Sequence, residues 1–145
     1  MKLDALRDIV YNIVGVLYEV HKELGPGLNE YVYQEGLDAE LKTRGIPFDK
    51  EKAFNPIYKG QRLNATYRLD FLCLDIAIIE CKAVSKITNE HRAQLFNYMR
   101  LTKTPAGILA NFAPCFMEVE RYFYNSETNE ILTFDGDVFT ELIRR

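Results

Sequence analysis

The stretch Ile76-Ala77-Ile78-Ile79-Glu80-Cys81-Lys82-Ala83 begins as a buried β-strand and ends with two charged side chains. Its first half is short, apolar and rich in β-branched residues, which is typical of a strand covered on both faces. Because alternate side chains of a strand share a face, Glu80 and Lys82 are expected to point the same way and Cys81 the opposite way. Charge at the end of an apolar strand indicates a functional site.

A second acid, Asp70, lies upstream in the strand-like run Tyr67-Arg68-Leu69-Asp70-Phe71-Leu72. If the two strands pair, Asp70 meets Glu80 and Lys82 on one face. Magnesium is held by one or two carboxylates and can promote phosphodiester hydrolysis. In this hypothesis Asp70 and Glu80 bind the metal, with the backbone carbonyl of Cys81 as a further ligand. Lys82 contacts the scissile phosphate or orients the attacking water.

A structural ion pair is the alternative, because short charged spacings such as D…ExK are common in proteins. Energetics favour the metal site. Burying acids without adequate partners costs several kcal/mol per ion, a large share of a domain's stability of roughly 5–15 kcal/mol. One lysine cannot balance Asp70, Glu80 and a third acid, Glu30, whereas a bound divalent cation can.

Glu30 belongs to a helix expected from about Leu28 to Arg44, ending at Gly45. The inward stripe of this helix is expected to contain Tyr33, Leu37 and Leu41. Glu30 precedes Tyr33 by three residues and so falls on the same stripe. It is either a first-turn acid favoured by the helix dipole or a metal ligand directed into the site.

A further helix is expected from about Asn89 to Thr102, with Thr88 as its N-cap. Gln94 and Tyr98 are four residues apart and share a face of this helix with His91. From spacing alone they are either an ordinary helix pair or part of the site. Basic residues near this helix form either a rim for a phosphate backbone or a solvated face: Arg92, Arg100 and Lys103.

The remaining pattern predicts a helix over Leu6–Leu24 and several strands. The expected strands and their turns cover Phe54–Tyr58, a turn at Lys59-Gly60, Leu63–Leu72, Ala106–Phe112, Val119–Tyr124 and Ile131–Phe134. A short last helix is expected from Asp135 or Asp137 through Ile143. The order of elements predicts one α/β domain over residues 1–145, with a central mixed sheet flanked by helices. The strands before and after the third helix should be parallel.

Composition points to a globular protein of the cytoplasm. The formal net charge of −3 argues against a protein that coats DNA by bulk electrostatics. No apolar run is long enough to span a bilayer, and the N-terminus lacks the pattern of a signal peptide. The three cysteines form no CxxC pair, so a disulfide framework is not expected. The expected location is therefore a reducing compartment.

Four motifs in this order resemble a known group of proteins. Asp70 followed by Glu80-Cys81-Lys82 resembles the core of the PD-(D/E)xK nuclease superfamily. Gln94-Leu95-Phe96-Asn97-Tyr98 is similar to the QxxxY motif of RecB-type exonucleases in that superfamily. Gly27-Leu28-Asn29-Glu30 is similar to the GxxE signature of the small bacterial GxxExxxR family, and Gly107-Ile108-Leu109-Ala110-Asn111-Phe112 extends the match.

The resemblance implies a restriction-endonuclease-like αβββαβ core and a Mg²⁺-dependent (or Mn²⁺-dependent) nuclease acting on nucleic acid, with DNA as the expected substrate. It implies catalytic or metal-binding roles for Glu30, Asp70, Glu80 and Lys82. Gln94 and Tyr98 would brace the lysine or contact DNA. The chain departs from the family pattern in two places. Position 34 is Gln rather than arginine, and Cys81 stands where an aliphatic residue is usual.

Two other functions fit the same sequence. One is a catalytically inactive nucleic-acid-binding module that keeps the fold, which the acidic net charge favours. The other is an interaction protein that forms a homodimer through the aromatic run Tyr122-Phe123-Tyr124. Neither needs a membrane partner.

Overall fold

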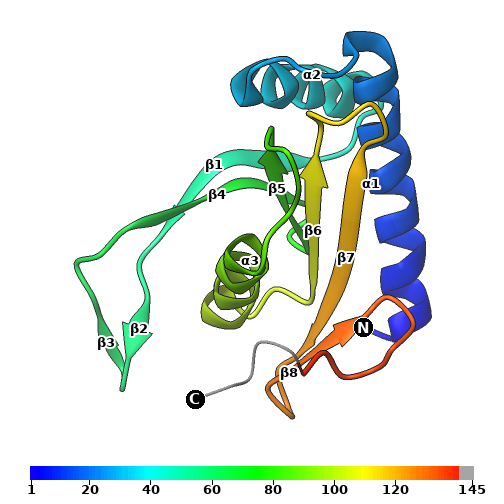
Figure 1. The fold of residues 1–145 in the computed structure, drawn as a ribbon. Coiled ribbons are helices and arrows are strands. Elements are labelled where there is room, and N and C mark those ends of the chain that lie inside the picture. The colour runs from blue at the N-terminus through cyan, green and yellow to red at the C-terminus, as the bar shows by residue number, and fades with distance from the viewer. Residues whose placement is uncertain (141–145) are drawn as a thin grey trace.

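In the computed structural model, which describes residues 1–140, three α-helices pack against a six-stranded sheet (Figure 1). The elements in chain order are α1 (Leu3–Leu24), α2 (Glu30–Thr43), β1 (Phe48–Phe54), β2 (Ile57–Tyr58), β3 (Gln61–Arg62), β4 (Tyr67–Cys73), β5 (Ala77–Lys82), α3 (Asn89–Thr102), β6 (Ala106–Asn111), β7 (Glu118–Asn125) and β8 (Glu130–Thr133). The sheet order is β1-β4-β5-β6-β7-β8, and β2 and β3 form a separate ribbon. Strands β5 and β6 are parallel, as expected, and the other neighbours are antiparallel. The α/β fold is consistent with a restriction-endonuclease-like core.

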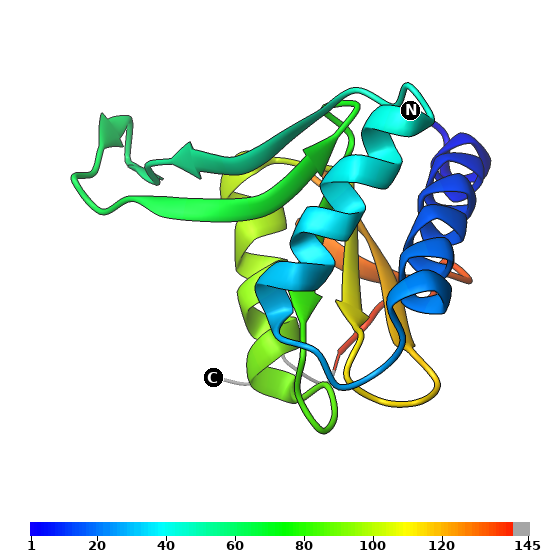
Figure 2. The same ribbon diagram turned by 90° about the horizontal axis from the view of Figure 1, so that it is seen from above.

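The helices cover the sheet on both faces, with α1 and α2 on one side and α3 on the other (Figure 2). Alternation along β5 assigns its side chains to these two layers. Ile79 and Cys81 are fully buried in the core beneath α1 and α2, whereas Ile78 packs with Leu95 of α3. Cys81 therefore faces away from the side of α3, as the sequence predicts. Glu80 and Lys82 belong to the α3 side.

Strands β1 and β4 extend beyond the sheet as a two-stranded arm, which we define as residues 52–69 (Figure 1). They pair from Phe48 opposite Cys73 to Phe54 opposite Tyr67, but β4 pairs with β5 only from Phe71 to Cys73. The ribbon β2–β3 lies at the tip of the arm, and its turn at Lys59-Gly60 is confirmed, with both residues at positive φ.

Several expected boundaries are wrong for local reasons. The expected strand Phe54–Tyr58 is only the short β2 at its end, and the expected Leu63–Leu72 is β4 at Tyr67–Cys73. The long strand Phe48–Phe54 is not predicted, because charged residues at an exposed sheet edge hide its alternation. Helix α2 begins at Glu30, two residues later than expected, since the preceding glycines have positive φ. Asp135 and Asp137 lie in a turn before a β-bridge at Val138, so they cap no helix. The rest of that expected helix falls partly in residues 141–145, outside the described residues.

The helix expected from Asn89 to Thr102 is confirmed with both boundaries correct. The Thr88 hydroxyl accepts a hydrogen bond from the His91 backbone N–H, and His91 Nδ1 accepts one from the Thr88 N–H (3.0 Å). His91 thus completes a capping box.

The aromatic run Tyr122-Phe123-Tyr124 in β7 packs within the chain, where the Tyr122 ring lies 4.7 Å from the Phe96 ring. None of the helices in residues 1–140 has the length and hydropathy needed to cross a membrane.

The hydroxyl of Tyr33 holds the loop that leads into α2. It donates to the Gly25 carbonyl (2.6 Å) and accepts from the Leu28 N–H (3.0 Å), and the side chain is completely buried beneath Phe112. These bonds fix where α2 begins. They therefore fix the position of Glu30, the first residue of the helix.

We expect Tyr33→Phe to lower the free energy of unfolding by about 1 kcal/mol, because the Gly25 carbonyl and the Leu28 N–H lose two part-buried hydrogen bonds. Urea denaturation measures this loss. The matched control is Tyr31→Phe, on the same helix but 61% exposed, which should leave the urea midpoint unchanged. Equal midpoints for the two variants would contradict the role given to the Tyr33 hydroxyl.

Candidate active site

Two carboxylates fill the gap that opens where β4 and β5 diverge. The last backbone pair is Phe71 opposite Ile79, and one residue further the backbones no longer pair. Instead, Glu80 Oε2 accepts a hydrogen bond from the Asp70 N–H (2.9 Å) and Asp70 Oδ2 accepts one from the Cys81 N–H (2.9 Å). The side chains thus replace the backbone ladder. Each carboxylate uses one of its two oxygens in these bonds.

The Cys81 carbonyl faces the same gap. In the parallel pair with β6, Ile76 and Lys82 accept from Ala106 and Phe112, so the even-numbered carbonyls of β5 face β6. The N–H and C=O of one strand residue point to the same side, and the Cys81 N–H is directed at Asp70. The backbone oxygen of Cys81 is therefore on the side of the two carboxylates.

Lys82 is oriented from helix α3. Its Nζ donates to Gln94 Oε1 (3.3 Å), and it forms no ion pair with an acid among the described residues. One helical turn further, Tyr98 is buried with its ring 5.5 Å from Phe54 and 5.8 Å from Tyr67, at the root of the arm. Burial and then the charges of Glu80 and Asp70 raise the pKa of Tyr98.

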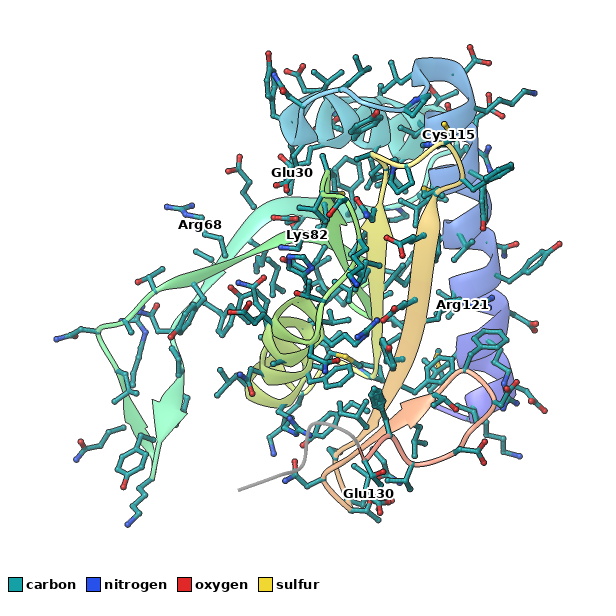
Figure 3. All side chains as sticks on the ribbon, viewed as in Figure 1. Glu30, Arg68, Lys82, Cys115, Arg121 and Glu130 are labelled. Carbon is teal, nitrogen blue, oxygen red and sulfur yellow. The ribbon has the colours of Figure 1, made fainter. Side chains whose placement is uncertain are left out.

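Glu30 approaches the site from the first turn of α2, and Figure 3 shows it above Lys82 at the end of β5. The residue is exposed, yet its carboxyl group is close enough to the site that partial desolvation and then the Asp70 charge raise its pKa. Lys82 opposes this shift. Gln34, one turn along the helix, donates to Glu30 Oε2 (3.3 Å) and lowers the pKa of Asp70.

Burial makes the acids of this site difficult to ionise. Glu80 is 3% exposed, and its burial, followed by the charge of Asp70, raises its pKa from an ordinary value of 4.5 to about 8. The Asp70 pKa is also raised, mainly by burial, although the hydrogen bond from Cys81 and the charge of Lys82 oppose the shift. Without an added cation, the site therefore holds fewer negative charges at neutral pH than its residues suggest.

The donor set fits a hard divalent cation. Two carboxylates and a backbone carbonyl bordering one gap are all-oxygen ligands, and Mg²⁺ commonly uses one or two carboxylates with water and substrate completing its octahedron. Within residues 1–140, no three carboxylate, imidazole or thiol side chains are close enough to bind a metal by themselves. The structure thus brings Asp70 and Glu80 together, whereas Glu30 affects them through its charge, which raises the Glu80 pKa.

Two polar residues beside the site have no predicted role. Gln34 is visible in the sequence only as the residue that replaces the family's arginine. Glu51 lies opposite Asp70 in the β1–β4 register, between the pairs formed by Lys50 and Lys52, and its charge raises the Asp70 pKa. No sequence spacing reveals this contact, because it depends on strand register. The guanidinium of Arg92, which is expected either in a basic rim or on a solvated face, donates to both carboxylate oxygens of Glu120 (2.6 Å each).

Comparison with known proteins identifies the family and the fold. The profile described as PD-(D/E)XK nuclease superfamily matches residues 7–122. No curated protein matches the chain. The solved structure titled "Crystal structure of SSO0001" matches with a TM-score of 0.55 and 20% identity over 68% of this chain. This chain spans about half (53%) of that structure's length, and at such low identity the similarity concerns the fold alone.

The raised pKa of Glu80 predicts a pH-dependent stability. Because the folded state holds a proton that the unfolded state releases near pH 4.5, the free energy of unfolding in metal-free buffer should fall as pH rises from 4.5 to 8. The maximum slope for one proton is about 1.4 kcal/mol per pH unit. Urea titrations across this range measure it.

Glu80→Gln should flatten this decline, and saturating Mg²⁺ should reduce it in the wild-type protein. The matched control, Glu23→Gln on the exposed surface of α1, should keep the wild-type slope. If the wild-type free energy of unfolding does not change between pH 5 and 8, ionisation of Glu80 does not destabilise the folded protein.

Proposed function

The chain belongs to the PD-(D/E)XK nuclease superfamily, and on that premise we propose that it is a Mg²⁺-dependent nuclease that hydrolyses phosphodiester bonds in DNA. The observation that carries this proposal is the opening between β4 and β5, where the Asp70 and Glu80 carboxylates lie side by side, together with Lys82 on the same face of the strand as Glu80. Mn²⁺ has the same preference for oxygen ligands and is expected to replace Mg²⁺.

In the proposed mechanism, Asp70, Glu80 and the Cys81 carbonyl would hold the cation, and Glu30 would add its negative charge. The bound ion supplies charge neutralisation on the phosphate and lowers the pKa of water. Lys82 binds a non-bridging phosphate oxygen or orients the attacking water. Its hydrogen bond to Gln94 orients the ammonium group, which makes Gln94 a positioning residue in this proposal.

The motif similarities support our proposal that, within the superfamily, the chain is related to the GxxExxxR group and carries a QxxxY-type helix. Tyr98 supports this assignment through its packing against the arm root, beside Gln94 and Lys82. The group's arginine is replaced by Gln34, whose amide donates to Glu30 rather than supplying a positive charge. A phosphate contact at that position is therefore weaker here than in proteins that keep the arginine.

A non-catalytic nucleic-acid-binding module is the second candidate. It is favoured by the bonds that Asp70 and Glu80 make to backbone N–H groups, because acids that only close a gap in a sheet would make the same bonds. In that case neither a divalent ion nor Lys82 is needed. The two candidates therefore differ in what happens when Lys82 is removed.

We expect the wild-type protein to cleave single-stranded or duplex DNA in Mg²⁺ or Mn²⁺, and Asp70→Ala and Lys82→Ala to reduce the cleavage rate by about 10²–10⁴-fold. Gel-based cleavage of a DNA panel, with and without EDTA, measures this. Lys86→Ala is the matched control, since this exposed lysine lies in the loop directly after β5.

Cleavage by wild type and Lys86→Ala, but not by the two site variants, supports the nuclease. If the wild type binds DNA but cleaves none of the panel in either metal, the binding module is correct. Equal cleavage rates for all four proteins would remove Asp70 and Lys82 from the mechanism.

A further inference from the structure

The arm carries an uneven distribution of charge. Residues 52–69 contain no acid, and their cations are Lys52, Lys59, Arg62 and Arg68. The whole chain has a formal net charge of −3, so the residues outside the arm hold 14 cations against 21 acids, a net −7. A positive segment on an otherwise acidic protein indicates a surface that meets a polyanion.

The arm also exposes large apolar side chains, which proteins usually bury in a core or an interface. Every residue from Ile57 to Arg68 is exposed, including Ile57 and Tyr58 (59% each) and Tyr67 (43%). A two-stranded ribbon has little stability by itself, because no second layer covers it. Aromatic and apolar surface interleaved with cations matches the chemistry of a nucleic-acid strand, which offers phosphates and base faces together.

The arm is nevertheless held in a defined shape. Asn55 Nδ2 donates to the Ala65 carbonyl (2.9 Å) and to Thr66 Oγ1 (3.0 Å), and Asn55 Oδ1 accepts from Arg62 Nη2 (2.6 Å). This single side chain ties together the loop before β2 and the loop after β3. The cations at the tip are therefore presented in fixed positions rather than on a loose loop.

The root of the arm lies beside the candidate active site. Arg68 precedes Asp70 by two residues of one strand, a separation of about 7 Å. Tyr67 lines a pocket of about 390 Å³ against α3, together with Gln94, Asn97 and Tyr98. Gln94 is the partner of Lys82, so this pocket adjoins the catalytic lysine. Figure 3 shows Arg68 on the arm, on the outer side of Lys82 and Glu30.

We propose that the arm is a second nucleic-acid contact surface, which holds the strand flanking the scissile phosphate through Lys59, Arg62 and Arg68. The proposal rests on the proposed function for its ligand class. Tyr67, exposed at the mouth of the pocket, stacks on an unpaired base next to the cleavage position. The arm thus attracts the substrate, whereas the acidic residues in the rest of the protein repel it.

The test measures DNA binding without turnover, by fluorescence anisotropy in EDTA. The arm variant combines Lys59→Gln, Arg62→Gln and Arg68→Gln. The matched control combines Lys2→Gln, Lys22→Gln and Lys42→Gln, which are exposed lysines outside the arm and give the same change in net charge. Arg68→Gln alone is included because Arg62 also donates to Asn55, whereas Arg68 forms no side-chain hydrogen bond within residues 1–140. Circular dichroism checks that all variants fold.

For a single strand of about 20 nucleotides, the arm variant should bind about tenfold or more weakly than wild type, and its slope of log K against log salt should be smaller by about 2. Arg68→Gln should show part of this loss, and the lysine control should bind as wild type. For a strand of about 5 nucleotides, which is too short to reach the arm tip, the difference between wild type and the arm variant should shrink.

Equal binding of the 20-nucleotide strand by wild type and arm variant overturns the proposal, as does equal weakening in the lysine control. So does a wild-type protein that binds no strand. If sedimentation instead shows that the arm variant converts a dimer to a monomer, the arm is an interface between copies. Hydrolysis of bis(nitrophenyl) phosphate by the wild type is measured in parallel: its absence counts against the proposed nuclease but leaves the binding result for the arm intact.

Discussion

The exchange of hydrogen bonds across the gap between β4 and β5 is the interaction on which the rest of the site depends. Beyond the pair Phe71 and Ile79 the ladder stops, and the N–H groups of Asp70 and Cys81 would lose their partners in a partly buried region. The Glu80 and Asp70 carboxylates supply the missing acceptors. The bonds that allow the arm to leave the sheet therefore also fix both acids at its open edge. One structural feature therefore sets both the opening beside the site and the positions of its two acids.

This arrangement has a cost in stability that the two cores must offset. Glu80 is almost fully buried, and the raised pKa values of Glu80, Asp70 and Glu30 all report the same unfavourable ionisation. Lys82 does not neutralise them directly, because its hydrogen bond is to Gln94. Glu51, opposite Asp70, adds backbone strain through its positive φ of 53°. Proteins keep destabilising groups of this kind at sites where a ligand relieves them.

The sequence allows the local features of the site to be predicted better than its tertiary contacts. The direction of Glu80, Cys81 and Lys82 follows from the two-residue repeat of a strand, and the start of α3 follows from the Thr88 cap. Strand β1 is not predicted from the sequence, because Asp49-Lys50-Glu51-Lys52 places charged residues on both faces of a strand at the sheet edge. The positions of Gln34 and Glu51 beside Asp70 depend on how α2 docks and how β1 registers with β4. No pattern within either segment determines these two features.

Charge links the site to the arm. Under the proposed function, the acids of the site repel a phosphodiester substrate until a cation is bound, and the rest of the protein is acidic as well. A small domain with little spare surface has to separate these two demands in space. The arm does so: its cations lie along a ribbon that begins one residue before Asp70 and extends away from the carboxylates. Screening between the arm tip and the acids is strong at physiological salt, where the Debye length is about 8 Å. Under the proposal, the cations at the arm tip therefore attract a phosphate backbone without weakening the negative potential around the acids, which favours a divalent ion.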